Sequence, residues 1–338
     1  MAHTLLFPVW GGAKFNIFPI IRMLYLLFAA MWFLKLLSYH HIWHDVRHHV
    51  ILANKLDSEE SDVKRERTTS YNASDVTLPR DRLSNGLNIP QYLLDSVLKY
   101  PSNVTLYDVI IFLLIPTLNY QLQYPYTKKF SFVKYVLWLM FYLVLLSIWV
   151  TIMLEYCMPL VLQCSFHFKR EEYIDFLYNF IKLSVPNTYA WLIMFYGTFH
   201  VYLNAYAELT GFADKNFYDD WWNSKTLGEY WRKWNLPVHN WLTRHIYYPM
   251  IRRKYSRNVS MLAVFFFSAL MHEYLVAGCI ETVTMIGFNS MAFQVPFILI
   301  QERYKKYLGG MIGNIIFWVI FCVIGQPAGM VMGYIFLT

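Results

Sequence analysis

Two ionisable residues, His272 and Glu273, lie in the middle of the apolar run AVFFFSALMHEYLVAGC. An ionisable side chain at bilayer depth is costly unless it faces a cavity or a partner, so such residues usually mark a functional site. Zinc-protease chemistry would require a second histidine four residues later, and that position holds Val276. Cys279 lies two helical turns from His272, about 10 Å, which is too far for direct proton transfer from a thiol. A histidine that only hydrogen-bonds a neighbouring helix is the alternative.

The motif FYDDWWN, residues 217–223, combines two carboxylates, two tryptophans and an amide. An aromatic belt at the membrane interface explains the tryptophans. It leaves Asp219, Asp220 and Asn223 unexplained, because packing alone does not require them. The composition therefore leaves two interpretations open: an interfacial anchor, and a site that acts on a substrate.

Two further clusters are candidates for binding. The sequence IRRKYSR, residues 251–257, offers four cations before an apolar run. These cations either hold the phosphates of coenzyme A on the cytosolic side or form a positive-inside flank of the span. His40, His44 and His48 recur at helical i, i+4 spacing, which is compatible with a metal ion. Beside the end of a span, a pH-titrating interfacial cluster is the favoured interpretation, and we predict no metal site.

The composition indicates a membrane protein. Of 338 residues, 57% are hydrophobic and 19% aromatic, too large a share to be buried in one soluble core. Charged residues amount to 15% and lie between long apolar runs. The net charge of +7 suits anionic headgroups or an anionic substrate such as coenzyme A, and we expect no nucleic-acid partner. The four cysteines lack metal-ligand spacing and are predicted to be reduced, buried thiols.

The apolar runs predict an all-α, polytopic protein with about six or seven transmembrane helices. Arg22 and Lys35 should reach the interface from the ends of the first span. The apolar stretch before Pro116 is too short to cross and should be re-entrant or interfacial. The segment 217–250 should form amphipathic helices at the interface, kinked at Pro237. The expected spans are residues 18–37, 133–156, 188–206, 259–286, 288–300 and 311–337.

The histidine of MHEYLV follows the asparagine of FYDDWWN by 49 residues, and this combination resembles the membrane-bound O-acyltransferase (MBOAT) superfamily. The motifs PTLNYQLQYP, VPN and LNAYAEL resemble the branch that contains diacylglycerol O-acyltransferase 1 and the sterol O-acyltransferases. WNLPVHNW, RHIYYPMIRR, HEYLV and IGQP are more similar to the diacylglycerol enzymes. The resemblance runs from about residue 34 to the C-terminus.

The resemblance implies an MBOAT fold in the endoplasmic reticulum membrane, with a reaction chamber inside the bilayer. It divides the chain into an N-terminal span (1–39), a polar loop (40–105) and an MBOAT catalytic core (106–338). The implied activity transfers a fatty acyl group from acyl-CoA to diacylglycerol, which gives triacylglycerol without a cofactor. A sterol or a long-chain alcohol is the alternative acceptor. An inactive scaffold or a lipid transporter is the alternative of another class, and a homo-oligomer is the expected assembly.

By the same resemblance, His272 is the catalytic base and Asn223 is the polar partner on the acyl-CoA side. A neutral imidazole can take the proton of an alcohol as the alcohol oxygen attacks the thioester, so no acyl-enzyme is required. An amide N–H aimed at the developing oxyanion is worth about 10²–10³ in rate. The predicted substrate-binding residues are Gln294 and Gln326 on the acceptor side, together with Glu273, Met291, Trp222, Trp234, Arg252 and Arg253.

Two features depart from the family pattern. The resembling enzymes usually carry further spans before the segment that is similar to LKLLSYHHIWHDVR, so we expect a shortened form or an incomplete gene product. Tyr248 stands where the family motif commonly has a lysine. Arg252 and Arg253 are expected to replace that phosphate contact.

Overall fold

Helices make up every regular element in the part of the chain that the structure describes. The structure is a computed structural model that describes residues 2–14, 19–67, 97, 99–127, 129–304 and 310–337. The only β contact among these residues is an isolated antiparallel bridge between Tyr126 and Phe212. The predicted all-α class is therefore confirmed.

The chain divides into two compact units, which are described separately. The larger unit holds the predicted catalytic and substrate-binding residues. It comprises Met1–Leu34, Ile115–Leu118 and Tyr124–Thr338, and the smaller unit comprises Lys35–Leu114 and Asn119–Gln123.

Four continuous helical segments in the described residues are long and apolar enough to cross a bilayer: Ile21–Lys55, Phe132–Lys169, Arg257–Ile280 and Gly310–Phe336. They contain or overlap four of the predicted spans. Of the two other predicted spans, 188–206 lies inside one continuous helical stretch. This stretch consists of α8 (Tyr173–Phe195), a π-helical segment (Tyr196–Tyr202) and α9 (Leu203–Thr210). The run 288–300 is divided between α14 (Ile286–Ala292) and α15 (Gln294–Arg303), each too short to cross a bilayer of about 30 Å. The total of six or seven spans stays a prediction.

Helix α2 corrects the prediction of a polar loop from residue 40. It runs from Pro19 to Arg67 without a break, so the first part of the expected loop is helical. The physical reason is that its charged stretch consists largely of glutamate, lysine and arginine, which are good helix formers. Residues 68–96 of the predicted loop lie outside the described residues.

The two cations of the predicted first span are buried, and this corrects their expected position at the interface. Arg22 and Lys35 are only 4% and 6% exposed. Arg22 pairs with Glu281 and donates to the Cys279 carbonyl oxygen at 3.3 Å. Both of these partners lie more than 250 residues away along the chain.

In the smaller unit, Lys35 binds the end of α5 (Leu106–Leu114). Its Nζ atom donates to the carbonyl oxygens of Phe112 and Leu113 at 2.9 and 3.1 Å. These carbonyls belong to the last turn of α5, where the helix dipole favours a cation. The nine residues of α5 are too few to cross a bilayer, as the sequence predicted.

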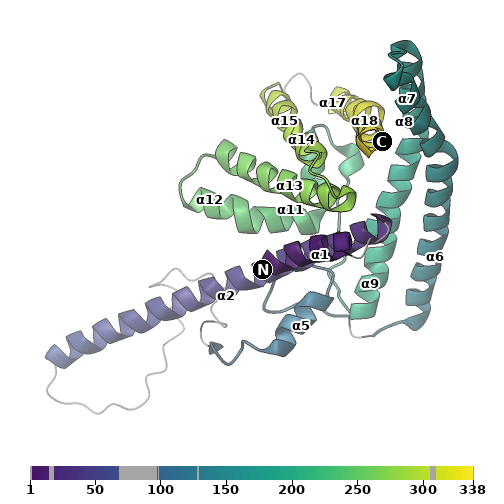
Figure 1. Cartoon of the computed structure of the whole chain (residues 1–338). Coiled ribbons are helices and arrows are strands. Elements are labelled where there is room, and N and C mark those ends of the chain that lie inside the picture. The colour runs from purple at the N-terminus through teal and green to yellow at the C-terminus, as the bar shows by residue number, and fades with distance from the viewer. Residues whose placement is uncertain are drawn as a thin grey trace. The chain divides into compact units, whose positions relative to one another are not determined.

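The larger unit is held together by an aromatic cluster. Its buried members come from α8, from the turn 221–223, from α10 (Leu227–Lys233), from α15 and from α17 (Gly310–Trp318). In Figure 1, α8 returns alongside α6 (Phe132–Thr151) and α7 (Met158–Lys169), and α13 (Arg257–Ile280) packs against α14. The buried cluster residues are Phe195, Trp221, Leu227, Tyr230, Ile298 and Phe317.

Among the described residues of this unit, four π-helical segments interrupt the helices. The π-helix is rare and occurs mostly as short insertions, frequently at functional sites. The segment that runs to Gly325 ends directly before Gln326, the first residue of α18 (Gln326–Leu337). The four segments are Ile152–Cys157, Tyr196–Tyr202, Thr243–Tyr247 and Val319–Gly325.

The tryptophan-rich segment consists of short helices, as predicted, but Pro237 does not kink any of them. Pro237 lies in the first turn of α11 (Leu236–Leu242), where a missing N–H costs little. Asn235 caps this helix, because its side chain accepts from the Val238 N–H at 3.2 Å. The proline therefore helps to begin a helix.

Candidate active site

His272 lies on α13, which begins after the N-cap Ser256. The His272 Nδ1 atom lies 2.7 Å from the carbonyl oxygen of Ser268. A carbonyl oxygen can only accept, so Nδ1 carries the proton and Nε2 keeps a free lone pair. The side chain is half-buried. The helix thus fixes the tautomer in which Nε2 can act as a base.

Glu273, the next residue, binds the start of the following helix. Its Oε1 atom accepts from the N–H groups of Thr284 and Met285 at 3.1 and 2.8 Å. Its Oε2 atom accepts from the Phe288 N–H at 3.1 Å. A carboxylate at a helix N-terminus satisfies unpaired N–H groups and complements the helix dipole. Glu273 therefore caps α14, and its predicted role in substrate binding stays a prediction.

The connection between α13 and α14 is a tight reversal. Glu281 and Met285, at its two ends, have left-handed backbone φ angles of 63° and 58°. Such values are uncommon for residues with a side chain and persist only where surrounding contacts fix them. The Glu273 cap and the pairing of Arg22 with Glu281 supply those contacts.

Gly287 allows α14 to lie directly on the backbone of His272 and Glu273. A Cβ atom at this position would lie 2.7 Å from the carbonyl carbon and oxygen of His272 and 2.8 Å from the amide nitrogen of Glu273. Only a glycine permits this approach without a shift of the helix. The sequence signal for it was a glycine in an apolar run, which is too common to be informative.

The FYDDWWN motif forms a turn that ends in the short helix Trp221–Asn223. Trp221 is 1% exposed, and the rings of Trp191 and Phe195 both lie 5.0 Å from its ring. Trp222 is 43% exposed, and Asn223 is also exposed. The interfacial belt therefore does not account for Trp221, which anchors the turn in the aromatic cluster.

The second carboxylate of the motif, Asp220, lies in an ion-pair network. Lys233 Nζ contacts Asp220 and Glu229, each at 2.8 Å. The Lys233 contact holds the pKa of Asp220 below its usual range, and the Asp220 contact raises the pKa of Lys233. The Asn223 amide donates to Asp220 Oδ2 at 3.3 Å. The charge pair thus ties the turn to α10, and Asn223 makes one long hydrogen bond to it.

Gln294 and Met291 lie together beside the tryptophans of α10. Trp231 Nε1 donates to Gln294 Oε1 at 2.8 Å, and Gln294 Nε2 lies 3.9 Å from Met291 Sδ. The ring of Trp234 lies 5.8 Å from that of Trp231. Four residues from two separate sequence regions are therefore brought together, and three of them were predicted to bind substrate.

The remaining predicted residues lie on other elements. Gln326 is half-buried at the start of α18. Arg252 and Arg253 are exposed at the end of α12 (Tyr248–Arg252), and Tyr248 is 53% exposed. Their predicted roles in acceptor and phosphate binding stay predictions.

Asn314 and Trp318 on α17 were not predicted, yet they contact the FYDDWWN turn. Asn314 Nδ2 donates to the carbonyl oxygens of Trp222 and Ser224 at 2.9 and 2.8 Å. Trp318 Nε1 donates to the Trp222 carbonyl oxygen at 3.1 Å. The available signal was an asparagine and a tryptophan four residues apart in an apolar run, and it does not reveal the partner.

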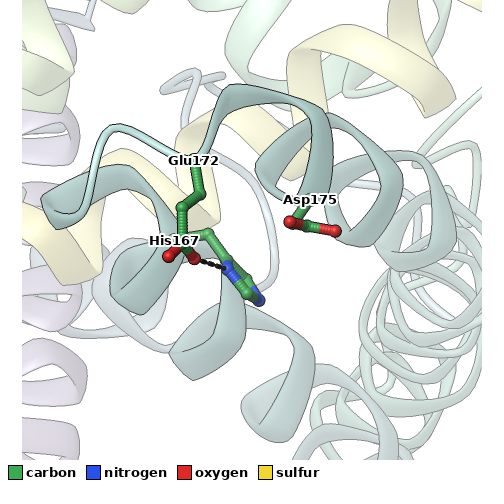
Figure 2. Close-up of side chains that lie close together, drawn as sticks. All are labelled: His167, Glu172 and Asp175. Carbon is green, nitrogen blue, oxygen red and sulfur yellow. Dashed lines mark hydrogen bonds and ion pairs between the residues drawn. The ribbon is translucent and has the colours of Figure 1, made fainter.

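One cluster among the described residues has the composition of a metal site. The potential ligand atoms of His167, Glu172 and Asp175 lie within 4.8 Å of one another (Figure 2). His167 is in the last turn of α7, and both acids are at the start of α8, as helix dipoles favour. His167 Nδ1 already lies 2.7 Å from Glu172 Oε2. Complementary helix ends account for the cluster, and we assign no ion to it.

All four cysteines are free thiols, as the sequence predicted. The prediction of burial is confirmed for Cys157 and Cys164 but is wrong for Cys279 and Cys322, which are half-buried. His40, His44 and His48, whose i, i+4 spacing is compatible with a metal ion, have exposed side chains on α2.

The apolar helices and the buried polar residues of α13 define a multi-pass helical membrane protein. The family model of the membrane-bound O-acyltransferases matches residues 31–334, and the chain belongs to this family. This family contains enzymes that transfer acyl groups to hydroxyl groups, as its name states.

Curated relatives bear names that specify the acyl acceptor. The chain is 39% identical over 270 residues to diacylglycerol O-acyltransferase 1C of Glycine max, covering 79% of this chain and 50% of that protein. It is 35% identical over 332 residues to diacylglycerol O-acyltransferase 1 of Corylus americana, covering 98% and 55%. It is 38% identical over 236 residues to diacylglycerol O-acyltransferase 1 of Dictyostelium discoideum, covering 70% and 38%. The chain thus spans about half the length of the curated relatives it matches.

Proposed function

We propose that this protein transfers a fatty acyl group from acyl-CoA to diacylglycerol and so makes triacylglycerol. The observation that carries the proposal is the imidazole of His272, which lies in an apolar helix with its Nδ1–H on the Ser268 carbonyl oxygen. This leaves Nε2 available to accept a proton. The names of the relatives support diacylglycerol as the acceptor.

The chemistry follows from that tautomer. Nε2 of His272 removes the hydroxyl proton of diacylglycerol as the hydroxyl oxygen attacks the thioester carbonyl carbon. The tetrahedral intermediate collapses, the C–S bond breaks, and the coenzyme A thiolate takes the proton from the imidazolium. The Ser268 carbonyl oxygen accepts from the imidazole in both protonation states, so the ring keeps its orientation.

Asn223 is proposed to stabilise the oxyanion. One of its amide hydrogens is directed to Asp220 in a long hydrogen bond of 3.3 Å, and the amide has a second hydrogen. A donor aimed at the oxyanion contributes about 10²–10³ to the rate.

Gln294 is proposed to orient the acceptor. Its Oε1 atom accepts from Trp231, and its Nε2 atom donates to the Ser290 carbonyl oxygen at 3.0 Å. These two contacts fix the amide plane, and the second N–H, which makes only a weak contact of 3.9 Å with Met291 Sδ, is proposed to bind a hydroxyl or an ester oxygen.

The remaining features of the proposal concern location and partners. Acyl-CoA is a substrate, so the reaction as written needs no cofactor and no acyl-enzyme. We propose the endoplasmic reticulum membrane as the location and a homo-oligomer as the assembly. Arg252 and Arg253, both exposed, are proposed to bind the phosphates of coenzyme A.

The test is expression of the full chain in yeast cells that lack their own neutral-lipid acyltransferases, followed by labelled oleate feeding and lipid separation. The proposal requires labelled triacylglycerol that disappears in His272→Ala at equal protein level. Steryl or wax ester as the sole product would assign a different acceptor. An absence of any labelled ester from a well-expressed chain would contradict the proposed activity.

A further inference from the structure

We propose that Asn314 and Trp318 are positioning residues that hold Asn223 in place for the acyl-CoA thioester. This inference rests on the proposed function, because it assigns these side chains a task in that reaction. The observation behind it is a set of three hydrogen bonds from one face of α17 to the backbone on both sides of Asn223.

The Asn314 amide bridges the turn. Its Nδ2 atom donates to the Trp222 carbonyl oxygen at 2.9 Å and to the Ser224 carbonyl oxygen at 2.8 Å. These carbonyls belong to the residues directly before and after Asn223. A planar amide with two fixed N–H directions therefore sets the distance between them.

Trp318 adds a second donor to the same carbonyl. Its Nε1 atom donates to the Trp222 carbonyl oxygen at 3.1 Å, so that oxygen uses both of its lone pairs. Asn314 and Trp318 are four residues apart and share a helix face. The Trp318 ring also lies 5.8 Å from the buried Trp221 ring, which joins this contact to the aromatic cluster.

Asn223 needs such support because its own side chain is weakly held. It is exposed, and its amide donates to Asp220 in a bond of 3.3 Å. The direction of the amide thus depends on the backbone of the turn. A misplacement of about 1 Å at a reacting group can cost about 10²-fold in rate. The three bonds from α17 restrict this displacement.

Two variants, each with a matched control, separate positioning from packing. Trp318→Phe keeps an aromatic ring in the cluster and removes the Nε1 donor, and the packing that is lost with the smaller ring is matched by the control Trp149→Phe. Asn314→Asp keeps the side-chain shape and replaces both donor hydrogens with an acceptor that faces two carbonyls. The matched controls are Trp149→Phe, in the separate hydrophobic cluster of α7 and α8, and Asn179→Asp, whose amide donates to the Asp175 carbonyl oxygen at 2.9 Å.

The experiment uses the full chain in lipid nanodiscs. It measures triacylglycerol formation with varied oleoyl-CoA and diacylglycerol, the unfolding temperature, and hydrogen exchange of peptides that cover 217–226. We expect Asn314→Asp and Trp318→Phe to lower kcat roughly tenfold, the effect of losing one to two well-placed hydrogen bonds. The KM for diacylglycerol should stay at the wild-type value, and the unfolding temperature should fall no further than in the matched controls. Exchange should rise only in 217–226, and both controls should keep the wild-type kcat.

Two results would overturn the inference. The first is wild-type kcat and wild-type exchange of 217–226 in both variants. The second is lower activity together with a lower unfolding temperature and faster exchange throughout α17, which would indicate packing alone. If the wild-type chain makes no triacylglycerol, the proposed function fails and the exchange data decide alone. A local rise in 217–226 then supports the three-bond contact, and its absence refutes it.

Discussion

Replacement of Glu273 tests whether this carboxylate caps α14 or binds the acceptor. In Glu273→Gln, the carbonyl oxygen of the new amide can still accept from Thr284 and Met285, but its NH₂ group would face the Phe288 N–H. One charge-assisted hydrogen bond is lost, and two donors are opposed. At about 1.5–3 kcal/mol for a bond to a charged group, the variant should lose roughly 2–4 kcal/mol of stability.

A leucine at the same position should cost more. Glu273→Leu removes both acceptor oxygens and leaves the N–H groups of Thr284, Met285 and Phe288 without this partner. An unsatisfied N–H away from water costs about 1–3 kcal/mol, so the expected loss is roughly 3–9 kcal/mol. Glu171→Gln is the control, because this exposed carboxylate lies in the turn between α7 and α8 and should change stability by less than about 0.5 kcal/mol.

The assay combines unfolding by denaturing detergent with hydrogen exchange of residues 281–292. If Glu273 caps α14, exchange at the start of α14 should be faster in both variants, and the increase should be larger in the leucine variant. The kcat should also fall, because α14 would no longer be held against the backbone of His272. A different result would refute the reasoning: unchanged stability and exchange in Glu273→Gln, with a raised KM for diacylglycerol alone. That outcome would assign the carboxylate to the substrate.

Three further predictions concern neighbouring residues. Gly287→Val should separate α14 from the backbone of His272, because even a Cβ would lie 2.7 Å from the His272 carbonyl oxygen. Triacylglycerol formation should fall at least tenfold. The control Gly329→Val, at a position with open space around it, should keep the wild-type rate. Trp231→Phe removes the donor to Gln294, which should raise the KM for diacylglycerol several-fold while the KM for oleoyl-CoA stays constant. The contact with Lys233 lowers the pKa of Asp220 in the folded protein. The contact therefore stabilises the turn at pH values above the usual aspartate pKa, and this stabilisation is lost as the pH falls through the lowered pKa. Protection of residues 217–224, expressed relative to the intrinsic exchange rate at each pH, should therefore fall on acidification in the wild type and be already low in Asp220→Asn.

The sequence predicted those features that depend on local pattern. The apolar runs predicted an all-helical protein and the positions of its longest helices, because a bilayer-spanning helix needs a long apolar stretch in one segment. His272 stood out since an ionisable residue within such a run is rare. The free thiols followed from the spacing of the cysteines.

Features that depend on distant partners were not predictable. Arg22 and Lys35 looked like interfacial cations, yet their buried positions depend on Glu281 and on the carbonyl groups of α5, respectively. The contact of Gly287 with the backbone of His272 depends on a reversal of the chain that no local pattern indicates. Asn314 likewise gained meaning only from its contacts with a turn some 90 residues earlier in the chain.

The composition of FYDDWWN marks an unusual segment but does not predict the separate environments of its residues. Two adjacent tryptophans have the same character in sequence, yet Trp221 is buried and Trp222 is exposed. The difference arises because the turn directs the two indoles to opposite environments. Asp220 is explained by Lys233, which the sequence separates from it by a whole turn and a helix.

The most direct test of the central claim is the turnover of purified His272→Gln in nanodiscs with oleoyl-CoA and diacylglycerol. Glutamine retains a polar side chain of similar reach but cannot accept and return a proton at neutral pH. General-base catalysis by His272 predicts a fall in kcat of about 10²–10⁴ with an unchanged unfolding temperature. Triacylglycerol formation at the wild-type rate by a folded His272→Gln protein would contradict it.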